Sequence, residues 1–335
     1  MISLSTLSLE RVPDFGQRGP GDLEWTTIAL MMVVLVVGLY YYVVKVADRC
    51  SCPKRLDGKT VIVTGANTGI GKETARDLAR RGARVILACR DAVRGREAEK
   101  DIRMSTGNDD VIFMKLNLAS FDSIRHFAQE FNNTEERLDI LVNNAGVIND
   151  GSLRTEEGHE LVFGVNHLGH FLLTNILLDK LQKCAPSRVI NVSSDAYMFG
   201  KLDLERLSVN DGRVKSYARS KLANVLFTRQ LADKMAGTGV VSFSLHPGSV
   251  NTEIKRNWAG WLRALAPLIS FFFLKSVKAG AQTSIHCAVS DDILDQSGEF
   301  FKGCQVQKLS RTAQDQDLAQ RLWDVSLEMT GLQSS

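Results

Sequence analysis

Short runs of β-branched residues alternate with helical patterns from residue 59 onward. The runs expected to form strands are Val61–Thr64, Arg84–Ala88, Val111–Lys115, Asp139–Val142, Arg188–Val192 and Val240–Leu245. Between them, the spacing of apolar residues predicts helices at Lys72–Arg81, Val93–Met104, Phe121–Phe131, about Arg154–Leu181 and Tyr217–Met235. Strand–helix alternation is typical of a parallel sheet with helices on both faces. We therefore predict an α/β fold with a doubly wound parallel sheet in a single domain.

A second pattern precedes this domain. The stretch from Trp25 to Val44 contains no charged residue, and aromatic residues stand at both of its ends. About 20 apolar residues cross a bilayer as a helix, and this stretch has that length. It is apolar all round, which argues against a buried amphipathic helix. We expect an N-terminal tail at 1–24, a transmembrane helix at 25–44, a juxtamembrane linker at 45–57 and the α/β domain at 58–335.

Charge around this stretch predicts its orientation. Four acidic residues precede it, whereas five basic residues follow it at Lys45, Arg49, Lys54, Arg55 and Lys59. The positive-inside rule then places the C-terminal domain in the cytosol. The acidic segment before the apolar stretch also differs from the basic N-terminal region of a signal peptide.

Composition narrows the remaining possibilities. The chain has 335 residues, of which 44% are hydrophobic, and a net charge of +3, which is too small to argue for nucleic acid as a partner. Six cysteines in a chain of this length do not make a disulfide framework, so we expect reduced thiols. Cys50 and Cys52 follow the apolar stretch, where lipidation and unmodified thiols both remain open.

A glycine-rich turn follows the first predicted strand. The spacing T-G-x-x-x-G-x-G places Gly65 at the tight turn, Gly69 where a backbone can approach a pyrophosphate, and Gly71 where a helix presses on the sheet. The helix N-terminus would offer free N–H groups to phosphates. The turn predicts a dinucleotide site in a Rossmann fold, lined also by Asn67, Thr68 and Ile70.

The second strand ends at Arg90, where an NAD site usually carries an acid. An arginine there suits a 2′-phosphate and favours NADP, although Asp91 follows directly. After the fourth strand, Asn144, Ala145 and Gly146 lie where ligands bind at a parallel sheet edge.

The candidate chemistry lies in the second half of the chain. Tyr217 and Lys221 are four residues apart and share one helical face. A close ammonium lowers the pKa of a phenol, so Tyr217 could exchange a proton with an alcohol or carbonyl oxygen that Ser194 holds. His167 and His170 have a spacing seen in metal sites, but helical packing explains them better, and we expect no metal.

With these motifs in order, residues 56–309 resemble the short-chain dehydrogenase/reductase family, and within it the membrane-anchored retinol dehydrogenase group. Two segments, 111–120 and 137–141, resemble a relative with no firmly assigned substrate. The resemblance implies that Tyr217 is the general acid/base, that Lys221 lowers its pKa and binds the nicotinamide ribose, and that Ser194 orients the substrate. It further implies that Asn166 completes a proton relay.

The resemblance also implies the remaining cofactor contacts. Those residues are Asn117, Leu118, Asn144, Ala145, Gly146, Pro247, Gly248, Val250 and Thr252. Two positions depart from the family pattern: Thr68 replaces a basic residue common in NADP enzymes, and Asn117 replaces an aspartate near the adenine. Arg90 then carries the expected 2′-phosphate contact almost alone.

A substrate lid is expected at about 252–278. It contains Trp258 and the run Phe271–Phe273, and is unusually apolar for a surface loop. Two interpretations stay open: the lid dips into the membrane interface and admits a lipophilic substrate, or its helices pack on the core.

We therefore expect a single-pass membrane oxidoreductase, facing the cytosol, in the endoplasmic reticulum by analogy. It would move a hydride between NADP(H) and a lipophilic alcohol/carbonyl pair, with retinol/retinal favoured. The alternatives are a steroid or lipid carbonyl reductase, and a non-catalytic nucleotide-binding scaffold. Its expected partners are a lipophilic substrate, the lipid bilayer and, in a homodimer, a second copy of the chain.

Overall fold

The computed structural model describes residues 20–45, 49–149, 152–248 and 275–333. The chain divides into two compact units, residues 1–43 and 44–335. Most of the first unit is one helix, α1 (Pro20–Lys45), which begins five residues before the predicted apolar stretch. Along it, large apolar side chains are exposed, including Trp25 (73%), Met31 (67%) and Val34 (64%). At about 1.5 Å per residue, its 26 residues reach about 39 Å.

The second unit is built on an eight-stranded sheet. Its strands are β1 (Thr60–Thr64), β2 (Arg84–Cys89), β3 (Val111–Lys115), β4 (Ile140–Asn143), β5 (Ser187–Val192), β6 (Val240–His246), β7 (Phe300–Lys302) and β8 (Gln305–Val306). They are ordered β3-β2-β1-β4-β5-β6-β7-β8, with only β8 antiparallel. The predicted doubly wound parallel sheet is confirmed. Its strand order reverses between β1 and β4, which is where such folds bind ligands.

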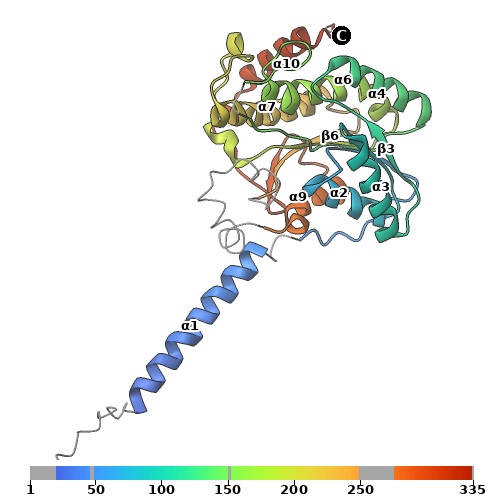
Figure 1. Ribbon diagram of the computed structural model, residues 1–335. Helices are drawn as coiled ribbons and strands as arrows, with labels where there is room; N and C mark the ends of the chain where they lie inside the picture. Colours follow the sequence, from blue (N-terminus) through green and yellow to red (C-terminus); the bar gives the residue numbers. More distant parts are fainter. Residues whose placement is uncertain (1–19, 46–48, 150–151, 249–274, 334–335) are drawn as a thin grey trace, which may run out of the picture. The chain divides into compact units, whose positions relative to one another are not determined.

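Helices cover both faces of the sheet (Figure 1). One face carries α2 (Gly69–Arg80), α3 (Ala92–Thr106) and α9 (Val277–Val289), and the other carries α4 (Phe121–Thr134), α6 (Gly169–Lys183), α7 (Arg213–Lys234) and α10 (Gln316–Thr330). Alternate side chains of a strand point to opposite faces. In β1, Ile62 joins the core under α4, α6 and α7, whereas Val61 and Val63 join the core under α2 and α9.

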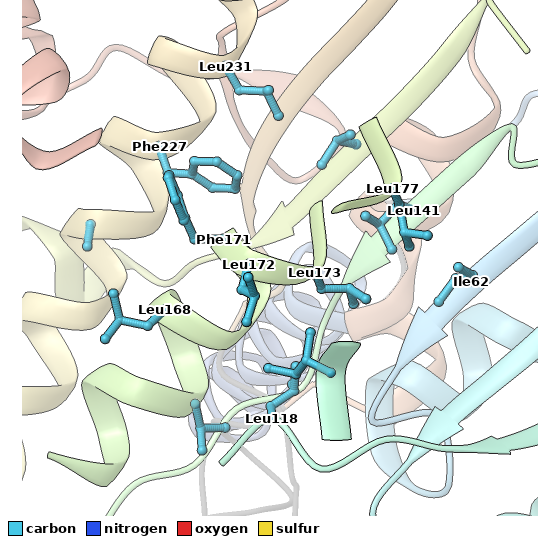
Figure 2. Close-up of a cluster of buried hydrophobic side chains, with 14 of the residues drawn as sticks. Ile62, Leu118, Leu141, Leu168, Phe171, Leu172, Leu173, Leu177, Phe227 and Leu231 are labelled. Atoms are coloured by element: carbon cyan, nitrogen blue, oxygen red, sulfur yellow. The ribbon is translucent and has the colours of Figure 1, made fainter. Parts of the chain in front are cut away.

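The larger core cluster brings together Ile62 of β1, Phe171 of α6 and Phe227 of α7 (Figure 2). It also includes Trp323 of α10. Phe171 of α6 and Phe227 of α7 lie 5.4 Å apart between ring centroids, and the Trp323 ring of α10 lies 5.0 Å from Phe171. By length and composition alone, the stretch Leu161–Lys183 could cross a bilayer, but 78% of its most apolar window is buried. It is therefore a core helix of the second unit.

The predicted helix at 154–181 is interrupted. It begins at α5 (Leu161–Phe163), widens into a π-helical turn η1 (Gly164–Leu168) and continues as α6. The buried Glu160 carboxylate caps α5 by accepting hydrogen bonds from the Val162 and Phe163 N–H groups. A Cβ on Gly164 would lie 2.3 Å from the Thr155 side chain, so the turn is packed too closely for a larger residue. Such π-turns occur frequently at functional sites.

Short elements complete the second unit. Among the described residues, 3₁₀ turns lie at η2 (Asp195–Phe199), η3 (Leu204–Arg206) and η5 (Thr312–Gln314). The sequence prediction did not include β7, β8, α9 or α10.

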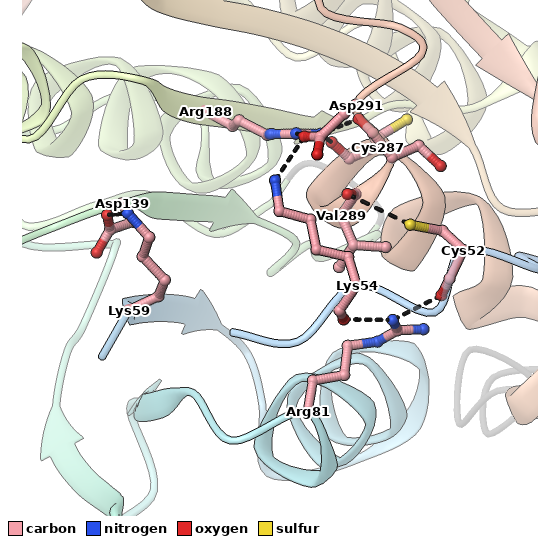
Figure 3. Close-up of polar contacts among 10 residues, drawn as sticks. Cys52, Lys54, Lys59, Arg81, Asp139, Arg188, Cys287, Val289 and Asp291 are labelled. Atoms are coloured by element: carbon pink, nitrogen blue, oxygen red, sulfur yellow. Dashed lines mark hydrogen bonds and ion pairs between the residues drawn. The ribbon is translucent and has the colours of Figure 1, made fainter. Parts of the chain in front are cut away.

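Within the second unit, Cys52 and Lys54 of the predicted linker are bonded to residues beside α2 and α9 (Figure 3). The Arg81 guanidinium donates to the carbonyl oxygens of Cys52 (2.8 Å) and Lys54 (2.9 Å). The Cys52 thiol donates to the carbonyl oxygen of Val289 at 3.6 Å, and Lys54 pairs with Asp291. This part of the predicted linker is therefore an ordered layer against α2 and α9.

Candidate active site

One cavity of about 540 Å³ opens at the carboxyl ends of the parallel strands. The predicted site residues that line it are Gly65, Asn67, Thr68, Gly69, Ile70, Gly71, Arg90, Asn117, Leu118, Asn144, Ala145, Gly146, Ser194, Tyr217, Lys221, Pro247 and Gly248. Asn166 is fully buried and is not among the lining residues. Val250, Thr252, Trp258 and Phe271–Phe273 lie outside the described residues, as does most of the expected lid.

The glycine turn is shaped for a close ligand. Gly65 (φ +65°) and Gly69 (φ +60°) adopt left-handed backbone conformations that favour glycine. A Cβ on Gly71 would lie 2.4 Å from the Asn144 amide nitrogen and 2.6 Å from the Gly65 carbonyl oxygen. Within the described chain, no side chain caps α2 and no acidic residue lies in its first turn. Its N–H groups are therefore available to a phosphate, which fits a dinucleotide.

Thr64, the last residue of β1, holds two cavity-lining residues at the point where the strand order reverses. Its hydroxyl oxygen accepts hydrogen bonds from the backbone N–H groups of Asn144 and Ala145, both at 2.9 Å. The hydroxyl also lies 2.9 Å from His170 Nε2, and His170 Nδ1 lies 3.1 Å from the Asn166 carbonyl oxygen. Because a carbonyl only accepts, we assign the His170 proton to Nδ1, so that Nε2 accepts from Thr64.

This network explains the pair His167 and His170 without a metal. Burial lowers the pKa of His170 to about 4 and that of His167 to about 3, so both rings are neutral. His167 Nε2 lies 3.0 Å from the Ser326 hydroxyl of α10. Across the described ranges, no group of three His, Cys, Asp or Glu residues could hold a metal ion.

Two arginines face the cavity beyond β2. Arg90 is exposed at the strand end, and Arg94, which the sequence reasoning missed, lines the same region from the first turn of α3. Asp91 caps α3 by accepting from the Arg94 N–H at 3.1 Å, and its carboxylate lies 3.6 Å from the Arg94 guanidinium. The Asp91 carboxylate, which argued against NADP in the sequence, is thus engaged in capping α3. The cations of Arg90 and Arg94 both line the cavity.

The other end of the cavity holds Ser194, Tyr217 and Lys221. Ser194 follows β5 and lies close enough to the Tyr217 hydroxyl to lower the pKa of the phenol. Helix α7 begins at Arg213, one turn before the predicted start, so Tyr217 and Lys221 lie in its first turns. The Lys221 ammonium lies 5.5 Å from the Tyr217 ring centroid and donates to the Val192 carbonyl oxygen at 2.9 Å. The structure therefore brings together the three side chains expected to perform the chemistry.

The pKa of Tyr217 is shifted in the direction opposite to the one expected from the sequence. Burial raises the pKa of Tyr217, and the nearby Ser194 opposes this only in part. The expected lowering by Lys221 is not found, since that ammonium stands over the ring and is bonded to Val192. Burial also lowers the pKa of Lys221 to about 8. At neutral pH, Tyr217 is therefore a protonated phenol above a cationic lysine.

Asn166 lies in the π-turn behind these residues. Its amide oxygen accepts from the Val147 N–H at 2.8 Å, and its amide nitrogen donates to the Val147 carbonyl oxygen and to the Ser220 hydroxyl, both at 3.0 Å. Asn166 thus joins the loop after β4 to the helix that carries Tyr217. Its role in a proton relay stays a prediction.

Comparisons with known proteins identify the family of this chain. Residues 59–263 match the family described as short chain dehydrogenase. The chain is 48% identical to retinol dehydrogenase 12 of Mus musculus, covering 85% of this chain and 90% of that one. It is also 48% identical to dehydrogenase/reductase SDR family member 13 of Homo sapiens, covering 88% and 78%. A solved Pseudomonas aeruginosa RhlG/NADP active-site complex is 27% identical with a TM-score of 0.60, covering 74% of this chain and 95% of that one.

The chain therefore belongs to the short-chain dehydrogenase/reductase family of oxidoreductases, which bind a nicotinamide cofactor. Within that family it groups with the retinol dehydrogenases and with family member 13. The glycine cradle, the free N–H groups of α2 and the cations beside β2 all fit a dinucleotide.

Proposed function

We propose that this protein is an NADP(H)-dependent oxidoreductase acting on a lipophilic alcohol/carbonyl pair, with retinol/retinal favoured. The observation that carries the proposal is that Ser194, Tyr217 and Lys221 line the same cavity as the glycine turn and the two arginines Arg90 and Arg94. The relatives named retinol dehydrogenase support the substrate class. The RhlG/NADP complex supports the choice of cofactor.

The dinucleotide would lie along the glycine turn, with its phosphates at the N-terminus of α2 and its 2′-phosphate at Arg90 and Arg94. When bound, the nicotinamide would supply or accept the hydride. Asn144, Ala145 and Gly146 would line the middle of the cofactor.

The protein's own part is to manage one proton. Ser194 would donate a hydrogen bond to the substrate oxygen, and Tyr217 would give its phenolic proton to that oxygen as it gains negative charge. The Lys221 ammonium, 5.5 Å from the ring centroid, would bind the nicotinamide ribose beside the phenolate that forms. Because burial raises the pKa of Tyr217, the phenol is protonated at neutral pH and suited to donate. This favours carbonyl reduction over alcohol oxidation.

Membrane attachment is part of the proposal. Helix α1 exposes large apolar side chains along residues 25–38, as a membrane-spanning helix would. The basic residues after it favour a cytosolic catalytic domain, and the endoplasmic reticulum follows by analogy with the family group. Protease added to sealed microsomes should digest the second unit without detergent; protection of that unit would contradict the orientation. The lipophilic substrate and a homodimer belong to the same proposal.

Turnover on a substrate panel tests the function directly. We expect the full-length protein in lipid nanodiscs to reduce all-trans-retinal with NADPH faster than with NADH. Fatty aldehydes and steroid ketones, assayed in parallel, separate the retinal activity from a general lipid or steroid carbonyl reductase. Protein that binds NADPH but reduces no member of the panel would instead be a nucleotide-bound scaffold.

A further inference from the structure

His167 is a buried histidine that the function proposed above does not use. It lies in the π-turn η1 directly after Asn166, and only 1% of the residue is exposed. Its Nε2 atom lies 3.0 Å from the Ser326 hydroxyl of α10, and its Nδ1 atom lies 3.4 Å from the Asn224 side-chain amide of α7. One imidazole ring therefore joins the π-turn to two helices of the second unit.

The contact between His167 and α10 is a hydrogen bond of defined direction. The Ser326 hydroxyl donates to the Leu322 carbonyl oxygen at 2.7 Å, so its oxygen accepts from His167 Nε2. Burial lowers the pKa of His167 to about 3, so the ring holds one proton at neutral pH, and Nε2 carries it. Because Ser326 is fully buried, loss of its oxygen would leave this N–H unpaired in the core, at a cost in free energy.

Aromatic rings close the space around His167. Its ring centroid lies 5.1 Å from that of Phe163, 6.0 Å from that of Phe171 and 6.1 Å from that of Phe227. The Trp323 ring of α10 packs on the same group, 5.0 Å from Phe171 and 5.8 Å from Phe227. Among these apolar rings, the imidazole is stable in the orientation that satisfies its N–H. Helix α10 thus determines where His167 points.

The position of Asn166 depends on the same turn. In η1 the Gly169 N–H donates to the Gly164 carbonyl oxygen, five residues back, where an α-helix would use four. Successive residues of an α-helix are turned by about 100°, so a shift of the extra residue along the chain would turn the Asn166 amide away from its partners. Those partners lie on the loop after β4 and on α7. A side chain fixed directly beside Asn166 opposes such a shift, and His167 is that side chain.

We propose that His167 is a positioning residue of the active site, through which the C-terminal helix α10 holds the π-turn that presents Asn166. The inference rests on the proposed function in one respect, because Asn166 must take part in proton transfer for its position to affect turnover. The hold of α10 on the turn does not depend on that function and can be measured separately.

Ser326→Ala removes the acceptor on α10 and leaves the π-turn itself unaltered. Gln320→Ala is the matched control, because it removes the 2.7 Å hydrogen bond between Gln230 and Gln320, which also joins α7 to α10 but does not involve the turn. The full-length protein in nanodiscs is used throughout. Hydrogen–deuterium exchange reports on the backbone at Gly164–Gly169, thermal melting reports on stability, and steady-state kinetics with the most active carbonyl of the panel gives kcat.

We expect Ser326→Ala to speed exchange of the Gly169 amide about threefold to tenfold, the worth of one neutral hydrogen bond, and to lower kcat by a similar factor with the NADPH Kd unchanged. Gln320→Ala should lower the melting temperature without either effect. His167→Leu should lower kcat as Ser326→Ala does, whereas His167→Gln, whose amide can place an N–H donor near the Nε2 position, should retain most of it.

A double-mutant cycle tests whether the effect passes through Asn166. In an Asn166→Ala background, Ser326→Ala should cause no further loss of kcat, because substitutions that act through one group are not additive. A full additional loss in that background, or exchange of the Gly169 amide that is unchanged in Ser326→Ala or equally fast in Gln320→Ala, would overturn the inference. If the wild-type protein reduces no carbonyl substrate, the proposed function is wrong, and the exchange measurement still decides whether α10 holds the turn.

Discussion

Removing the Arg90 guanidinium tests whether this end of the cavity recognises a 2′-phosphate. Arg90 lies exposed at the end of β2, and no described residue forms an ion pair with it. In Arg90→Ala, the protein should keep its fold, because the side chain contributes nothing to the core. The loss should therefore appear in cofactor choice and not in stability.

The structure sets the size of the effect. A charge-assisted hydrogen bond contributes about 1.5–3 kcal/mol, and the exposure of Arg90 places it at the lower end. About 1.5 kcal/mol corresponds to roughly a tenfold loss in kcat/KM for NADPH. Arg94 is weakened as a phosphate ligand by its contact with Asp91, so we expect a smaller loss from Arg94→Ala. NADH lacks the phosphate, and its kcat/KM should change by less than about twofold.

The assay measures kcat/KM for NADPH and NADH at saturating carbonyl substrate and at two salt concentrations. Lys100→Ala is the matched control, because Lys100 is exposed on α3 away from the cavity lining. It removes one positive charge without touching the site. Equal losses for both cofactors in Arg90→Ala, or the same NADPH loss in Lys100→Ala, would refute a specific 2′-phosphate contact.

Three further predictions follow from the site and the linker. Tyr217→Phe should reduce turnover by about 10²- to 10⁴-fold, the usual worth of a positioned acid, with the NADPH Kd unchanged by titration; normal turnover would refute the assigned acid. Since burial lowers the pKa of Lys221 to about 8, its charge is lost as pH rises through that value, so carbonyl reduction should decline above pH 8. Lys221→Met should show no such decline in a pH–rate profile. Arg81→Ala should speed amide hydrogen exchange in the linker, whose backbone Arg81 holds, whereas the neighbouring Arg80→Ala should not.

Much of the fold could be predicted because the parallel strands are buried on both faces. Such strands become continuous β-branched or apolar runs, and all six predicted strands occur within one or two residues of their expected bounds. The fourth strand begins one residue later than predicted, at Ile140, although the Asp139 backbone still bonds Thr60 and Arg188 on either side. β7 and β8 are only three and two residues long, too short to leave a periodic signal.

The site was predicted where the backbone itself restricts the residue type. Gly65 and Gly71 are required by a left-handed turn and by a close approach to Asn144, and both leave a pattern in the sequence. The missed residues act through tertiary placement. Arg94 reaches the cavity because α3 begins directly after β2, and His246, which also lines the cavity, contacts Asp195, 51 positions away in the chain. No local spacing reports such a contact.

The direction of the pKa shift of Tyr217 also could not be predicted from the sequence. A spacing of four residues correctly places Lys221 on the same helical face as Tyr217. The spacing does not indicate how deeply the two side chains are buried. Burial acts on both groups, raising the pKa of the phenol and lowering that of the amine. The sign of a shift in a buried pair is therefore a property of the packed core.

The two halves of the cavity are joined by one buried chain of hydrogen bonds. Thr64 at the glycine turn bonds His170 Nε2, His170 Nδ1 bonds the Asn166 carbonyl oxygen, and the Asn166 amide bonds the Ser220 hydroxyl. Ser220 lies on α7 between Tyr217 and Lys221, and its hydroxyl donates to the Tyr217 carbonyl oxygen at 2.8 Å. The four residues from Thr64 to Ser220 in this chain are buried, so an interruption would leave a polar atom unpaired at a cost of about 1–3 kcal/mol. The turn that would hold the cofactor and the helix that would deliver the proton are thereby kept in one fixed relation, which hydride transfer between the two requires.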